Sequence, residues 1–272
     1  MSAAGSAAQA DGAARDDAMA LYLYCFAPAD AAGLPPEAPA VDGGGLSVHR
    51  HAGLTALVSP VRRADYEGEQ GVANLADIGW VGPRALRHQT VLDAALAATT
   101  VFPLPFATLF SSVAVLEAEM ASRRTDILAA LDRLAGCAEW AVQGQLDRAR
   151  ALDARVAEAI AAGRFVPPAA AGRRHLEEQR LRRALTPDLE AWAARRAAAL
   201  ADALRPQCRG LVERRIPSGQ ALAFNWALLV PDAARAAVEE VLTAAAPELA
   251  ECGLTLEFKG PWPGYSFTGG TP

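Results

Sequence analysis

Apolar and polar residues alternate with two different periods along the chain, and together these periods predict a mixture of strands and helices. Ala20–Phe26 (ALYLYCF) is a run of aromatic and apolar residues that stops before Pro28, as a buried strand does. Two further strands are predicted at residues 46–51 and 54–61, separated by a turn at Gly53. Residues 65–80 are polar and contain glycine, which predicts a loop with a short helix.

The period then changes to that of a helix, which the dipeptide Gly82-Pro83 is predicted to open. One apolar stripe with spacing i, i+3, i+4, i+7, i+8 follows, formed by His88, Val91, Leu92, Ala95 and Leu96. Residues 99–110 (TTVFPLPFATLF) are rich in β-formers but contain Pro103 and Pro105, which predicts an edge strand or a shaped loop. A second helix is predicted to begin after Ser111 or Ser112 and to stop at Gly136.

From Glu139 onward the predicted order of elements is β, α, α, β, β, α, β. This order fits a ferredoxin-like unit with a longer helical excursion in its first crossover. The fold class is therefore predicted as α+β with two domains joined by helices, the N-terminal one having the smaller sheet. The predicted boundaries are a disordered leader over residues 1–18, an N-terminal domain over 19–138, a C-terminal domain over 139–259 with a helical insertion at about 148–185, and an extended tail over 260–272.

Composition narrows the class of protein. Hydrophobic residues make up 52% of the chain and aromatic residues only 6%, because alanine supplies much of the apolar content. No run of about 20 apolar residues occurs, so no membrane span is expected. Residues 1–18 lack the basic start and apolar core of a signal peptide, so secretion is not indicated. The four cysteines are far apart and form no CxxC pair, which argues against a disulfide framework or a zinc site.

The charge is unevenly distributed. The formal net charge is −5, yet residues 173–215 contain eleven arginines and only six acidic residues. The acids and alanines are interleaved with the arginines at helical spacing, which favours a solvated helix face or a surface for an acidic partner. No aromatic strand of an RNA-binding type accompanies these helices, so no nucleic-acid partner is predicted.

The histidines are the main candidates for chemistry. His49 and His51 alternate with Arg50 and so share one face of a strand, but no third ligand follows at a metal-binding spacing. His88 lies on an apolar helix stripe, where a histidine that is hydrogen-bonded inside the core is the more common case. No GxSxG, Walker loop or GxGxxG motif occurs. No catalytic residue, cofactor or metal is therefore predicted, although an enzyme with a histidine-containing cleft stays open as an alternative.

The segment Gly260–Phe267 (GPWPGYSF) combines two prolines, two glycines and three aromatic rings. It can be neither an ordinary helix nor a central strand. It could serve as a ligand platform, a strip for a partner, or a plug for the protein's own core. Its position directly after the last predicted strand favours the plug, with Trp262, Tyr265 and Phe267 packing back on the protein.

Several stretches, taken in order, resemble the gas vesicle proteins of the GvpF/GvpL family. They are YLYCF, LTALVSPV, RHQTVL, VFPLPFATLF, AGCAEWAVQ, AGRRHLEEQR, FNWALLV and the terminal GPWPGYSF. Two departures stand out. Ala107 replaces the glycine of the family's usual P-x-x-FGT, which suggests either that a positive φ is not required there or that the backbone shifts slightly, and Gly264 replaces the second proline of GPWPPYSF.

The resemblance implies a cytoplasmic accessory or minor structural protein that is associated with the gas vesicle, the organelle of buoyancy, and that lacks catalytic activity. Its implied partners are the hydrophobic shell protein GvpA and other accessory Gvp proteins. The structural family motif corresponds to His88, Trp226, Trp262, Tyr265 and Phe267. The proposed partner contacts are Phe102, Leu104, Phe106 and Phe110, although these four side chains could instead fill the core of their domain.

Overall fold

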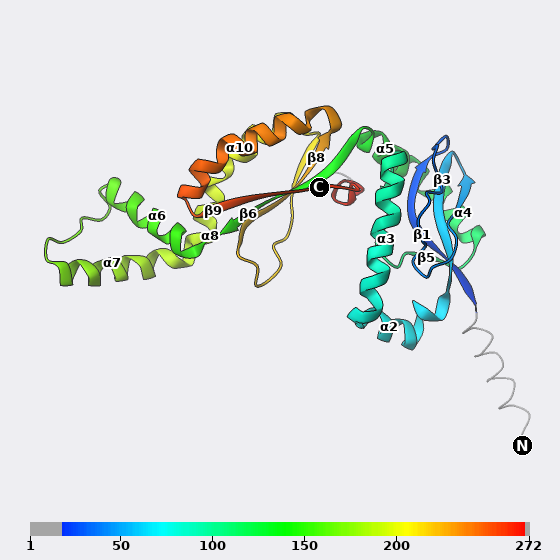
Figure 1. The fold of residues 1–272 in the computed structure, drawn as a ribbon, viewed down its shortest axis with the longest axis horizontal. Coiled ribbons are helices and arrows are strands. Elements are labelled where there is room, and N and C mark those ends of the chain that lie inside the picture. The colour runs from blue at the N-terminus through cyan, green and yellow to red at the C-terminus, as the bar shows by residue number, and fades with distance from the viewer. Residues whose placement is uncertain (1–17, 270–272) are drawn as a thin grey trace, which may run out of the picture. The chain divides into compact units, whose positions relative to one another are not determined.

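The computed structural model describes residues 18–269, and the chain divides into two compact units. Unit 1 comprises Met1–Gly136 together with Trp262–Pro272, and unit 2 comprises Cys137–Pro261. The leader predicted over residues 1–18 lies outside the described residues except for Ala18. Each unit carries its own antiparallel sheet and helices, so the predicted α+β class is confirmed (Figure 1). The prediction that the N-terminal unit has the smaller sheet is wrong, because over the described residues its sheet has five strands and that of unit 2 has four.

The sheet of unit 1 is organised around β1 (Met19–Pro28), which is buried along most of its length. The strand order is β2-β3-β1-β4, and β5 also pairs with β1. The partner strands are β2 (Ser47–His51), β3 (Leu54–Arg62), β4 (Phe102–Pro103) and β5 (Leu109–Phe110). The segment TTVFPLPFATLF thus forms two very short edge strands, because its prolines cannot donate to a continuous ladder.

The helices of unit 1 cover both faces of this sheet. A β-bulge in β1 determines which side chains of that strand point to each face. They are α2 (Gly68–Ala76), α3 (Ile78–Ala98), α4 (Val113–Ser122) and α5 (Arg124–Leu134). Tyr22 and Tyr24 pack in one apolar cluster with α3, whereas Leu23 packs in a second cluster with α4 and α5. A register shift between Leu23 and Cys25 reverses the alternation, so Phe26 joins the second cluster.

Helix α3 begins earlier than the sequence predicts. Asp77 caps it by accepting a hydrogen bond from the Gly79 amide at 2.8 Å, and Pro83 lies inside the helix rather than at its start. The predicted start was wrong because the Asp77 side chain pairs with a main-chain amide that is otherwise unpaired at a helix start. This cap lets the helix begin at Ile78, although Gly79 and Gly82 have low helix propensity. The predicted stripe on this helix is confirmed at His88, Val91, Leu92 and Ala95, which are buried.

Unit 2 has the strand order β7-β8-β6-β9. Its strands are β6 (Cys137–Leu146), β7 (Gly210–Glu213), β8 (Leu222–Pro231) and β9 (Leu254–Trp262). Its helices are α6 (Arg148–Ala161), α7 (Ala171–Leu185), α8 (Leu189–Arg196), α9 (Ala198–Leu204) and α10 (Arg235–Glu251). The ferredoxin-like topology of this unit stays a prediction.

The core of unit 2 lies between one sheet face and the helices. Trp140, Phe224, Trp226 and Leu228 point to this face and pack with residues of α8, α9 and α10. Gly144 on β6 leaves room for the Phe224 ring, since a Cβ at this glycine would lie 2.3 Å from a ring carbon. Across residues 18–269, no helix has both the length and the apolar content needed to span a bilayer.

Candidate functional site

Residues 262–269, which we call the tail, pack on unit 1 although they lie far from that unit's other residues in sequence. Tyr265–Phe267 form a single 3₁₀ turn, and the Phe267 side chain is buried. Arg133 on α5 donates a hydrogen bond from Nη2 to the Phe267 carbonyl oxygen at 2.7 Å. Gly264 lies so close to α5 that a Cβ there would be 2.4 Å from a methyl carbon of Leu134. The tail is therefore part of the packing of unit 1.

His88 is the polar centre of this packing. Its Nδ1 lies 2.9 Å from the Tyr22 hydroxyl, and its Nε2 lies 3.2 Å from the Tyr265 hydroxyl. The Tyr22 hydroxyl also accepts a hydrogen bond from the Ala107 amide at 3.0 Å, so its own proton can be donated to His88. The Tyr24 ring stacks on the imidazole with a centroid distance of 5.6 Å. Four segments of unit 1 thus meet at one histidine.

Burial controls the ionisation of this cluster. Desolvation lowers the pKa of His88 to about 4, and it raises the pKa of Tyr265 above its ordinary value. His88 is therefore neutral near pH 7, and both of its ring nitrogens already have hydrogen-bond partners. Because both nitrogens are engaged and the side chain is buried, the geometry of His88 is that of a core residue.

The other histidines lie elsewhere. His49 and His51 on β2 approach one carboxylate oxygen of Glu117 on α4, at 3.0 Å and 3.7 Å respectively. They are associated with α4, whereas His88 is on α3, and these two helices contribute to different apolar clusters. Over residues 18–269, no group of three His, Cys, Asp or Glu side chains is arranged to hold a metal ion. His175 lies on the exposed face of α7.

The four predicted partner contacts occupy two kinds of environment. Phe102 and Leu104 are buried and pack with α4 and α5 of unit 1, so neither side chain is presented at the surface. Phe106 and Phe110 are half-buried and pack against the same unit's apolar clusters. Of the predicted motif tryptophans, Trp226 is buried in unit 2, whereas Trp262 is partly exposed.

Four large apolar side chains are exposed on two consecutive helices of unit 1, three of them in the segment that was predicted to be mainly a polar loop. We call these four side chains the apolar strip: Val72 and Leu75 on α2, and Ile78 and Leu86 on α3. Ile78 is 82% exposed and Leu86 is 70% exposed, although both belong to an ordered helix. Val72 and Leu75 are three residues apart on α2 and so share a face. The i, i+3 spacing of Val72 and Leu75 was the signal that could have revealed the part of the strip on α2.

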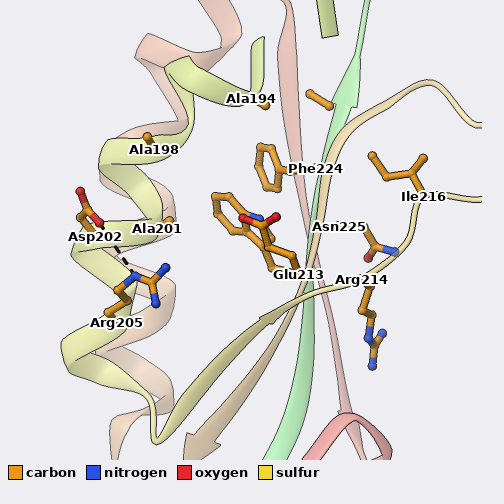
Figure 2. A pocket seen from close by; sticks show the side chains of 12 residues that line it. Ala194, Ala198, Ala201, Asp202, Arg205, Glu213, Arg214, Ile216, Phe224 and Asn225 are labelled. Atoms are coloured by element: carbon orange, nitrogen blue, oxygen red, sulfur yellow. Dashed lines mark ion pairs between the residues drawn. The ribbon is translucent and has the colours of Figure 1, made fainter. Parts of the chain in front are cut away.

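Unit 2 contains a pocket of about 260 Å³ between α8, α9 and the sheet (Figure 2). Alanines of the two helices form one wall, including Ala198 and Ala201, and Phe224 and Trp226 form the floor. The two rings stack with a centroid distance of 4.0 Å. Arg205 and Asp202, which lie 3.9 Å apart, and Glu213 supply charged groups at the rim, whereas the Arg214 side chain points away from the pocket and forms an ion pair with the buried Glu139.

The fold and these features define a class. This is an α+β protein of two units, each with its own antiparallel sheet, and its surface over the described residues includes the apolar strip and the pocket of unit 2. The family model described as "Gas vesicle synthesis protein GvpL/GvpF" matches residues 20–269, so the chain belongs to this family.

Solved structures agree with this assignment. The gas vesicle protein GvpF from Anabaena sp. PCC7120 is similar with a TM-score of 0.69 at 17% identity, covering 93% of this chain and 98% of that one. GvpF from Microcystis aeruginosa is similar with a TM-score of 0.65 at 17% identity, covering 92% and 99% respectively. At such identity the likeness shows the fold. No curated protein sequence matched the chain.

Proposed function

We propose that this protein binds the hydrophobic shell protein GvpA and assists gas vesicle assembly in the cytoplasm, without catalysis. Family membership over residues 20–269 is the observation that carries the proposal. A protein that handles an aggregation-prone partner needs apolar surface of its own, and the apolar strip on α2 and α3 supplies it. Other accessory Gvp proteins are the further partners that the family supports.

The apolar strip is a better candidate for this contact than TTVFPLPFATLF. Phe102 and Leu104 are already buried in unit 1, so their burial cannot drive association. Ile78 and Leu86, in contrast, lose their exposed area only when a partner covers them. Burying a side chain of this size contributes roughly 1.5–3 kcal/mol, which helps to offset the free-energy cost of association.

The contacts of the histidines bear on the proposed absence of catalysis. His88 is buried and engaged at both nitrogens. His49 and His51 share Glu117 with one another, in an arrangement that joins β2 to α4. The enzyme alternative requires a cleft in which a histidine converges with a carboxylate. His88 does not offer that geometry, so the alternative depends on His49 and His51, which meet Glu117.

The test is capture of GvpA by the purified full-length protein. We expect Ile78→Asp and Leu86→Asp together to reduce GvpA capture on the order of tenfold or more, because a charge would have to be buried in the contact. Leu176→Asp is the control, since Leu176 is also an exposed leucine, on α7 of unit 2. Normal vesicles after deletion of this gene from a gas vesicle cluster, with no detectable GvpA binding, would contradict the proposal.

A further inference from the structure

Strand β7 leaves one edge of the unit 2 sheet open. It is the terminal strand in the order β7-β8-β6-β9, and it pairs only with β8, from Gly210 opposite Leu229 to Glu213 opposite Trp226. No other strand in the described part of the chain pairs with its outer side. An open edge presents main-chain N–H and C=O groups that a further strand can bind.

The hydrogen bonds identify which residues form this open edge. The Arg214 amide donates to the Asn225 carbonyl oxygen at 2.7 Å, so the main chain of Arg214 faces β8. Main-chain groups alternate in direction along an antiparallel strand. Val212 therefore also faces β8, whereas the main-chain groups of Leu211 and Glu213 point to the outer side.

The pocket of Figure 2 lies next to this edge, on the helix-covered face of the sheet. Glu213 and Arg214, at the end of β7, belong to its lining, together with Ala198 and Ala201 on α9. The Phe224 and Trp226 rings form an apolar floor, and the alanine wall keeps the space open. An extended segment paired with β7 directs every second side chain to this face.

We infer that the β7 edge and its pocket bind an extended segment of a partner protein, which adds a strand to the sheet and places one apolar side chain in the pocket. Main-chain hydrogen bonds to Leu211 and Glu213 provide affinity, and the pocket provides selectivity. The pocket favours an apolar side chain because the Phe224 and Trp226 rings and the alanines of α8 and α9 line it, with the Glu213 carboxylate at the end next to β7. This site is in unit 2 and is independent of the apolar strip.

The experiment uses the full-length protein and a phage-displayed library of random peptides of about ten residues, the upper length of an ordinary strand. The selected sequences are expected to converge on an apolar residue with β-formers on both sides. A synthetic copy of the selected peptide is then titrated by fluorescence polarisation. N-methylation of alternate peptide amides should abolish binding at positions that face β7 and leave binding unchanged at the positions between them.

Two variants test the two parts of the site. Glu213→Pro removes an outward N–H without removing a hydrogen bond to β8, and we expect it to weaken binding on the order of tenfold. Ala198→Phe fills the pocket and should weaken binding by at least as much. Ala199→Phe is the matched control, because Ala199 is the next residue on the same helix, is also exposed, and lies outside this pocket's lining.

Three results would overturn the inference. The first is a library selection without convergence. The second is a selected peptide whose affinity is the same for Ala198→Phe and Ala199→Phe. The third is a concentration-dependent dimer in sedimentation that Glu213→Pro abolishes, which would assign the edge to a second copy of this chain. Should Glu213→Pro fail to fold, as judged by its melting curve, the pair of alanine variants decides the outcome.

Discussion

Ala107 is held in a backbone conformation that ordinarily belongs to glycine. Its φ is 63°, and its amide is fixed by the Tyr22 hydroxyl. The family's usual residue at this position is glycine, and the interpretation that a positive φ is not required here was wrong. A Cβ in the left-handed region costs roughly 1–2 kcal/mol, only part of which is offset by the greater chain entropy that glycine loses on folding.

Ala107→Gly should therefore raise the free energy of unfolding by about 0.5–1 kcal/mol. Urea denaturation measures this difference. Ala129→Gly is the control, because Ala129 is an exposed residue in the middle of α5, where glycine should lower stability by about 1 kcal/mol. Equal signs for the two variants would show that the backbone at Ala107 is not strained.

The burial of His88 makes the stability of the fold depend on pH. Burial lowers the pKa of His88 to about 4 in the folded state, below the ordinary value of about 6.5 for an unfolded chain. Between these values the unfolded state binds more protons, so stability is complete above pH 6.5 and falls as the pH decreases toward 4. The total contribution is on the order of 3 kcal/mol.

This dependence can be measured by urea denaturation between pH 4.5 and 7.5. His88→Gln should remove the His88 component and flatten the curve in that window, at the cost of a lower overall stability. His175→Gln is the control, since His175 is exposed on α7. A curve for His88→Gln that still has the full slope of the unmodified protein would contradict the assignment of this component to His88.

At the scale of elements, α3 depends on its cap. Asp77 supplies the only side-chain acceptor that the structure shows at this helix start, and the helix then continues through Gly79, Gly82 and Pro83. Asp77→Ala should lower the free energy of unfolding by about 1 kcal/mol, whereas Asp77→Ser should retain most of it. Asp77 adjoins Ile78 of the apolar strip, and neither variant changes an apolar side chain. Measuring GvpA capture by Asp77→Ala and Asp77→Ser therefore shows how far capture depends on the stability of α3 rather than on the apolar side chains themselves.

The spacing of apolar residues correctly predicted the elements that have a strong period. It failed where glycine and proline obscured a helix start, and where a contact joins residues far apart in sequence. The strand at Ala20–Phe26 and the buried stripe around His88 and Leu92 could be predicted because both carry many apolar residues at one spacing. The start of α3 at Ile78 could not be predicted, because Gly82 and Pro83 suggested that the helix begins later. The contact between His88 and Tyr265 joins residues 177 positions apart, and no sequence spacing encodes such a pair.

At the scale of the whole molecule, the chain leaves unit 1 at Gly136 and returns to it at Trp262. Unit 1 is therefore completed only after unit 2 has been synthesised, and Tyr265 and Phe267 belong to the segment that completes it. This arrangement supports the interpretation of GPWPGYSF as a plug. If the tail acts as a plug, then its side chains contribute to stability before any partner binds.

Phe267→Ala tests this interpretation directly. Because Phe267 is buried against unit 1, its truncation should lower the free energy of unfolding by about 3 kcal/mol, the usual range for a large buried side chain. Trp262→Ala is the comparison, since Trp262 is 39% exposed and should cost less despite its larger ring. Thermal melting measures stability and GvpA capture measures binding. A side chain that contributes to the fold changes the melting temperature of the isolated protein when it is truncated. An unchanged melting temperature for Phe267→Ala, together with a loss of GvpA capture, would therefore identify the tail as a docking surface instead.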